Sequence, residues 1–314
     1  MCAAGCLETG GICVPRMPIS PKKMVSTVGE VRAAAEVPAR IKVVGQDRVA
    51  LDSIRDALLA GSPNGDGEAL VELEVIEPSS GGGLPRLDRE STAAVILAAP
   101  SREIASPAVE RMLEDAGRAE IPVVLVLSEA PGVELSFPSA GVGPRRVVSI
   151  APDGSTPADV LAEAVVDAAG EAAVGLAARL PALREETCRQ VIRRTARQNA
   201  VVGALFIIPG ADMPVMTLNE ARMVLRIAAA HGEQVGVDRA VELLGVVGGG
   251  LGLRAIARQA LSFAVGPGWA IKSGIAYGGT RAMGEAANAY FAGEARVTPS
   301  RLASLAQRLK NLRG

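Results

Sequence analysis

The strongest chemical signal in the sequence is an apolar run, 41–44, that ends on Gly45. A phosphate-binding loop has a glycine, four residues, a second glycine, a lysine and a serine or threonine. Its backbone amides and lysine hold phosphate, and the hydroxyl holds magnesium. Counted from Gly45, the last three positions hold Ala50, Leu51 and Asp52. The lysine and hydroxyl are missing and a carboxylate would repel phosphate, so the sequence predicts a nucleotide-binding architecture without its ligand.

A second candidate site contains Asp212, at a break between two expected helices. This carboxylate lies among apolar neighbours and therefore needs a partner. Arg222 and Arg226, on a helix expected over 217–231, are the candidate partners. The group fits a small polar site in an apolar bundle or, as the favoured interpretation, a helix cap with a structural salt bridge. The single histidine, His231, falls at a helix end and is not expected to be a catalytic base.

Glycines in the second half are candidate docking positions. Gly248 with Gly252, and Gly274 with Gly278, have the small-x-x-x-small spacing that lets helices approach closely in membranes and in tight soluble bundles. Basic residues interrupt each candidate membrane span, at about 2.5 to 3.5 kcal/mol each at mid-bilayer. We therefore expect helices that lie at a membrane surface, insert as shallow hairpins or pack as a soluble bundle.

The cysteines do not indicate a metal site. Cys2, Cys6 and Cys13 fall in the first thirteen residues at spacings that match no zinc template, with no histidine nearby. An irregular, disordered start of the chain is the favoured interpretation of this segment. The sequence predicts no cofactor and no metal, and it nominates no catalytic residue.

Composition limits the classes of partner. The chain has 314 residues, 33 Lys and Arg against 34 Asp and Glu, and 2% aromatic residues, so nucleic acid is not an expected partner. Hydrophobic residues make up 49%, although no uninterrupted apolar run is long enough to span a bilayer. We expect a protein on the cytoplasmic side of a membrane, or otherwise in the cytoplasm, with reduced thiols.

The hydrophobic pattern changes character near residue 170. The expected strands before it are 41–44, 69–76, 93–98, 123–127 and 147–150, and the expected helices are 51–59, 106–119 and 157–168. The helices expected after it are 183–205, 217–231, 237–247, 251–265, 269–277, 281–291 and 298–312.

These patterns predict a three-layer α/β domain with a mainly parallel, Ras-like or Rossmann-like sheet, followed by an all-α, glycine-rich helical domain. The expected boundaries are an irregular extension over 1–39, the α/β domain over 40–170, the helical domain over 171–296 and a polar C-terminal helix over 297–314.

The order of elements over about 40–170 resembles the Ras-like domain of the P-loop GTPases, in architecture but not in motifs. The positions of that family's Asp-x-x-Gly and Asn-Lys-x-Asp motifs hold Glu77-Pro78-Ser79-Ser80 and Ser128-Glu129-Ala130-Pro131. The Ser-Ala pair beside the base is echoed only by Ser149 and Ala151. The resemblance therefore implies a pseudo-GTPase domain, whereas a generic doubly wound domain unrelated to GTPases is the alternative.

A second resemblance covers roughly 185–293. The segments IIPGADMPVMTLNEARMVLRIAAAHG (207–232) and VELLGVVGGGLGLRAIARQALSFAVGPGWAIKSGIAYGGTRAMGEAANAYF (241–291) look like the helical domain of domain-of-unknown-function family 697. That family occurs in YcjF-type membrane proteins and behind GTPase-like domains. It implies a helical module that is often membrane-associated and has no established activity.

Together these observations predict a non-catalytic scaffold or regulatory protein, whose helical domain docks on a membrane surface or a protein partner, with homo-oligomers as a possibility. A nucleotide-binding switch with non-standard motifs and a soluble helical oligomerisation module remain the alternatives. The loop after Gly45 discriminates the first alternative, since a switch needs an anion nest with free amides there.

Overall fold

The computed structural model describes residues 6–9, 12–15, 21–36, 39–62, 65, 67–76, 87–100, 106–128, 146–149, 157–205, 213–234 and 268–293. The chain divides into two compact units. One contains residues 29–190 and 229–233, and the other contains residues 1–28, 191–228 and 234–314. Each unit is described by itself below.

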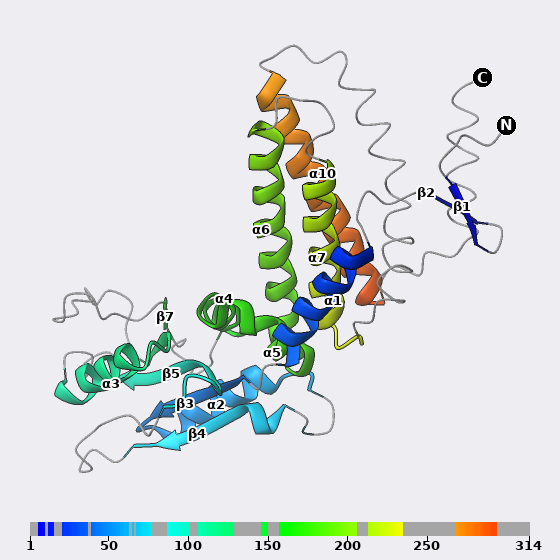
Figure 1. The fold of residues 1–314 in the computed structure, drawn as a ribbon. Coiled ribbons are helices and arrows are strands. Elements are labelled where there is room, and N and C mark those ends of the chain that lie inside the picture. The colour runs from blue at the N-terminus through cyan, green and yellow to red at the C-terminus, as the bar shows by residue number, and fades with distance from the viewer. Residues whose placement is uncertain are drawn as a thin grey trace. The chain divides into compact units, whose positions relative to one another are not determined.

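The first unit is built on a five-stranded, all-parallel sheet in the order β4-β3-β5-β6-β7 (Figure 1). The strands are β3 (Arg40–Gly45), β4 (Val71–Val75), β5 (Thr92–Pro100), β6 (Val123–Ser128) and β7 (Arg146–Ser149). The first strand along the chain lies between the second and the third. Such a sheet changes its direction of winding between its first and third strands, here β3 and β5, and ligands bind doubly wound sheets at this switch point.

Helices cover both faces of the sheet, which gives three layers. Helix α3 (Pro107–Arg118) packs on one face through Val109, Met112 and Leu113, against the odd-numbered apolar residues of β5 and β6. Helices α2 (Arg48–Leu59) and α4 (Ala158–Ala169) contact each other and the strands on the other side. The predicted α/β class with a parallel sheet is therefore confirmed, and the central strands β5 and β6 are the nearly continuous apolar runs that burial on both faces requires.

The first unit extends beyond the predicted boundary at residue 170. The 3₁₀ turn η4 (Gly170–Ala172), helix α5 (Ala173–Arg179) and the 3₁₀ turn η5 (Pro181–Leu183) follow α4. Leu176, Leu180 and Leu183 are completely or almost completely buried. The hydrophobic pattern is helical on both sides of residue 170, so it does not show which core these leucines join.

The N-terminal segment also differs from the expected irregular extension. Strands β1 (Cys6–Thr9) and β2 (Ile12–Pro15) form an antiparallel hairpin, and α1 (Pro21–Glu36) is a regular helix. Val28 and Val31 of α1 are buried, because their spacing places both on one face of the helix. The sequence indicates only a short helix-like patch over 28–36 in this segment, and α1 begins seven residues before it.

In the second unit, α6 (Arg184–Leu205), α7 (Met213–Ala230) and α10 (Gly268–Phe291) supply the described helical core. We call residues 191–205, 213–228 and 268–291 the three-helix group; Figure 1 shows these helices side by side. The prediction of one helix over 183–205 is confirmed by α6. The prediction of two helices over 269–291 is wrong, since α10 continues through Gly278 and Gly279 without a positive φ angle.

The remaining expected elements, at 237–247, 251–265 and 298–312, lie outside the described residues, as does the polar C-terminal segment 297–314. Within the described helices, none combines the length and the apolarity that crossing a membrane requires.

Candidate functional site

The switch point of the sheet carries a very short connection. β3 ends at Gly45 and α2 begins at Arg48, so only Gln46 and Asp47 join them. We call Gly45, Gln46 and Asp47 the β3–α2 corner. A phosphate-binding loop uses four residues between its two glycines, and here the third and fourth of those positions already belong to α2.

One amide in the first turn of α2, that of Val49, has a side-chain partner within the chain. Asp47 is the N-cap of this helix: its side chain accepts a hydrogen bond from the amide of Val49 at 2.9 Å, and its carbonyl accepts from Leu51 at 3.0 Å. Helix N-termini attract anions, and this one already holds the Asp47 carboxylate. An anion nest requires a residue in the left-handed region, and no residue of the β3–α2 corner has a positive φ.

Gly45 has a packing reason to be glycine. A Cβ atom at this position would lie 2.7 Å from the carbonyl oxygen of Ala98 and 3.1 Å from Cδ2 of Leu51. The carbonyl of Gly45 accepts a hydrogen bond from the amide of Ile76 at 2.8 Å. The close approach of β3 to β5 and α2 therefore explains this glycine without a phosphate ligand.

The three residues at the positions of the missing motif are all within α2. Ala50 and Leu51 face the core, with 8% and 0% of their surfaces exposed. Asp52 is half-buried, and its Oδ2 lies 3.1 Å from Nε of Arg48, one turn earlier. A phosphate-binding loop would have its lysine at residue 51. A lysine there would place its charge in the core of this domain.

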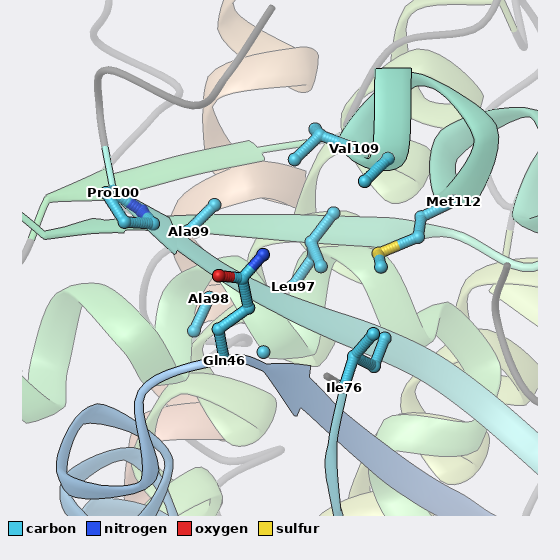
Figure 2. Close-up of a pocket in the computed structure, with 10 residues that line it drawn as sticks. Gln46, Ile76, Leu97, Ala98, Ala99, Pro100, Val109 and Met112 are labelled. Atoms are coloured by element: carbon cyan, nitrogen blue, oxygen red, sulfur yellow. The ribbon is translucent and has the colours of Figure 1, made fainter. Parts of the chain in front are cut away.

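A small hollow lies beside the β3–α2 corner at the carboxyl ends of β3 and β5. Figure 2 shows the side chain of Gln46 extending over the end of β5, near Leu97 and Ala98, with Ile76 and Met112 also lining the hollow. Its volume is about 10 Å³, which holds one water molecule at most. Sites for small organic ligands occupy several hundred Å³, so a nucleoside does not fit this hollow as it stands.

The described residues offer few other side chains for metal binding or nucleophilic chemistry. No three His, Cys, Asp or Glu side chains gather there to hold a metal ion. Burial raises the pKa of the Cys188 thiol to about 12, against a smaller lowering effect of Arg184. This cysteine therefore stays protonated near neutral pH and is a poor nucleophile or metal ligand. Cys2 and the side chains of Cys6 and Cys13 lie outside the described residues.

The most polar buried region lies in the three-helix group. Asn199 of α6 and Thr280 of α10 are completely buried, and Glu220 of α7 is 2% exposed. The hydroxyl of Thr280 donates to Oε1 of Glu220 at 3.0 Å, and Nδ2 of Asn199 donates to Oγ1 of Thr280 at 2.9 Å. Asn219, which is half-buried, donates to Oδ1 of Asn199 at 2.9 Å. These four residues form the polar cluster, and its hydrogen bonds run in one direction toward the carboxylate.

Sequence reasoning missed the polar cluster, although a signal was present. The buried positions of α6 include Ile192, Ala196 and Asn199, and those of α7 include Glu220, Met223 and Ile227, at helical spacing. A polar residue on the apolar stripe of a helix needs a hydrogen-bonding partner.

Of the seven predicted docking residues, four lie within the described residues. Arg222 and Arg226 are half-buried on α7, whereas Asp212 lies outside the described residues, so its pairing with either arginine stays a prediction. Gly274 and Gly278 are exposed on α10, and a Cβ atom at either position would meet nothing within 4 Å. Gly248 and Gly252 also lie outside the described residues.

The positions expected to carry the family's nucleotide motifs are mostly outside the described residues. Among the two motif replacements and the Ser-Ala pair, only Ser128 and Ser149 are described, as the last residues of β6 and β7. Comparison with known proteins gives no relative, since no family model, curated protein or solved structure matches the chain.

Proposed function

We propose that this chain is a non-catalytic scaffold or regulatory protein. Its first unit is a GTPase-like domain that works without nucleotide, and its helical domain docks on a membrane surface or on a protein partner, at the cytoplasmic side of the membrane. The order of the five parallel strands supports a doubly wound, nucleotide-binding ancestry for the first unit, although this order alone is shared by several unrelated functions.

The observation that carries the proposal is the β3–α2 corner. The helix start that would hold a phosphate is capped by Asp47, and the connection before it has two residues. A bound polyphosphate would need to displace this carboxylate or lie beside it, which is electrostatically unfavourable. Gly45, the residue that suggested a phosphate loop, is required by the packing of β3 against β5.

The docking part of the proposal rests on the three-helix group. Gly274 and Gly278 leave an exposed strip of α10 over which another surface can approach closely. Arg193 and Arg197, one turn apart on α6, are exposed and suit an anionic surface. A soluble oligomer that uses the same strip is the second candidate, and the glycine positions alone do not distinguish the two.

Calorimetry tests the first half of the proposal. The purified chain is titrated with GTP and with ATP in the presence of magnesium, and we expect no binding heat at millimolar nucleotide. Micromolar binding would contradict the proposal and indicate a nucleotide switch. In that case Asp47→Asn, which removes the charge at the corner, should tighten binding, whereas the matched change Asp52→Asn should do so much less.

Co-sedimentation tests the second half. The chain is mixed with vesicles of neutral lipid and with vesicles that contain phosphatidylserine, and its mass in solution is measured on the same sample. Pelleting with the anionic vesicles supports membrane docking. A stable oligomer that does not pellet supports the soluble oligomerisation module, and a monomer that binds neither vesicle contradicts both and leaves a protein partner to be captured by cross-linking.

A further inference from the structure

Helix α10 contacts α6 and α7 through a face of small side chains. Its buried positions are Ala276, Thr280, Gly284 and Ala287, at the i, i+4, i+8, i+11 spacing of one helix face. Among the described side chains of α10, no large apolar residue is fully buried; Ile275, Met283 and Phe291 are half-buried. Helix α7, in contrast, buries Met223, Val224, Leu225 and Ile227 completely or almost completely. Because stabilisation follows buried apolar area, the part of α10 whose side chains are described, from Ser273 on, is held less strongly than α7.

The close approach of α10 depends on Gly284. A Cβ atom there would lie 2.6 Å from Cγ1 of Ile192 and 3.0 Å from the sulfur of Met223. Ile192 is β-branched and adjusts poorly, so a side chain at residue 284 would push the helices apart. Gly278 lies six residues earlier in the same helix, yet a Cβ atom there meets nothing within 4 Å. Shape, rather than apolar area, fixes α10 in place.

The other half of the contact is polar. Where α10 rests on α6 and α7, the side chains beneath Thr280 are Asn199 and Glu220. When a helix separates from an apolar surface, the free energy that was gained by burying that surface is lost. When it leaves a polar one, water replaces the lost hydrogen bonds, so the net cost is small. The polar cluster therefore makes the separated state of α10 tolerable.

We propose that α10 is a releasable helix. It separates from α6 and α7 as a unit, while those two helices and the parallel sheet stay folded, and it uncovers the surface formed by Ile192, Asn199, Glu220 and Met223. That surface then accepts a helix of matching chemistry, with small residues at i, i+4 and i+8 and a hydroxyl to donate to Glu220. Such a device regulates access to the surface and does not depend on whether the first unit binds nucleotide.

Hydrogen exchange measured by mass spectrometry on the full chain tests this inference. Local opening is read from amide exchange in peptides that cover α10, α6 from Val191 on, and α7, with β5 and β6 as the reference for global unfolding. In the unmodified chain we expect the amides of α10 to exchange at least about tenfold faster than those of α6 and α7. Equal protection of the three helices would overturn the inference, because it would show one cooperative unit.

A matched pair of substitutions sharpens the test. Gly284→Ala should accelerate exchange in α10 by about tenfold or more, because it overpacks the contact, and should change α6 and α7 much less. Gly278→Ala adds a methyl group in open space and should slow exchange in α10 alone by about fivefold at most, through helix propensity. A parallel change in all three helices for either variant would overturn the inference. If Gly284→Ala fails to fold, β5 and β6 lose protection, and the unmodified chain and Gly278→Ala decide the question.

Discussion

The β3–α2 corner and the polar cluster present opposite relations between sequence and environment. At the corner and in the first turns of α2, a glycine and two acidic residues lie where a doubly wound sheet usually meets its ligand, yet each has a local structural role. Gly45 allows β3 to approach β5, Asp47 caps α2, and Asp52 pairs with Arg48. In the polar cluster, Glu220 and Asn199 stand on the buried faces of helices, where apolar side chains would pack without any need for partners.

Polar residues at a helix start and polar residues in a core therefore have different effects on stability. A charged residue at a helix start or on an exposed face has an ordinary explanation and stabilises its own element. A buried carboxylate costs desolvation even where it accepts hydrogen bonds, and replacing a buried charged group and its partners by apolar residues is often neutral or stabilising. The polar cluster is therefore the part of the described chain whose sequence is least explained by stability.

The largest effect tests whether Leu51, at the position of the phosphate-binding lysine, is a core residue of α2. Leu51→Lys places a charge at a site with 0% exposure and should lower the free energy of unfolding by about 3 to 5 kcal/mol. Val49→Lys, two residues earlier at 76% exposure, should change it by less than about 0.5 kcal/mol. Urea unfolding of both variants measures this difference. A stable Leu51→Lys variant that gains nucleotide affinity would contradict our interpretation of the corner.

The next effect tests how tightly the polar cluster depends on its carboxylate. Glu220→Ala removes the acceptor for Thr280 and Asn199 and leaves a cavity, so it should cost about 3 kcal/mol. Glu220→Gln keeps an oxygen acceptor and should cost roughly 1 kcal/mol. The control is Glu285→Ala on α10, whose pair with Arg281 is exposed to solvent and should contribute little to stability. Equal costs for residues 220 and 285 would show that the cluster has no special energetic role.

A glycine pair tests the packing explanation of the corner. Gly45→Ala should destabilise the protein by about 1 to 3 kcal/mol, because its new Cβ meets the carbonyl of Ala98. Gly29→Ala, in α1, has nothing within 4 Å and should stabilise by up to about 1 kcal/mol through helix propensity. Thermal unfolding of the two variants should therefore shift in opposite directions. A neutral Gly45→Ala would mean that some other requirement selects glycine there.

The smallest effect separates a helix cap from a surface pair. Asp47→Ala removes the acceptor of the Val49 amide and should cost about 1 kcal/mol. Asp52→Ala removes only the pair with Arg48 and should cost about 0.3 to 0.5 kcal/mol. Urea midpoints resolve this difference if the slopes are unchanged. An Asp47→Ala variant no weaker than Asp52→Ala would remove the cap from our account of the corner.

The local residue pattern predicts the α/β class of residues 40–170 and the approximate position of each strand. The central strands β5 and β6 are nearly continuous apolar runs, as burial on both faces requires, whereas the edge strand β4 alternates apolar and acidic residues. The same kind of pattern predicts α6, in which charged and apolar residues recur with the period of a helix. These features are local, so they can be read from neighbouring residues.

The packing and hydrogen-bonding roles of the polar residues and glycines follow only from tertiary contacts. Gly45 resembled a ligand-binding residue until its distance to Ala98, 53 positions later, gave it a packing role. Gly278 and Gly284 look alike in sequence, yet one is exposed and the other receives Ile192 and Met223. The hydrogen bond between Glu220 and Thr280 joins residues 60 positions apart. Such roles are set by contacts between distant segments, and hydrophobic periodicity carries no record of which segments meet.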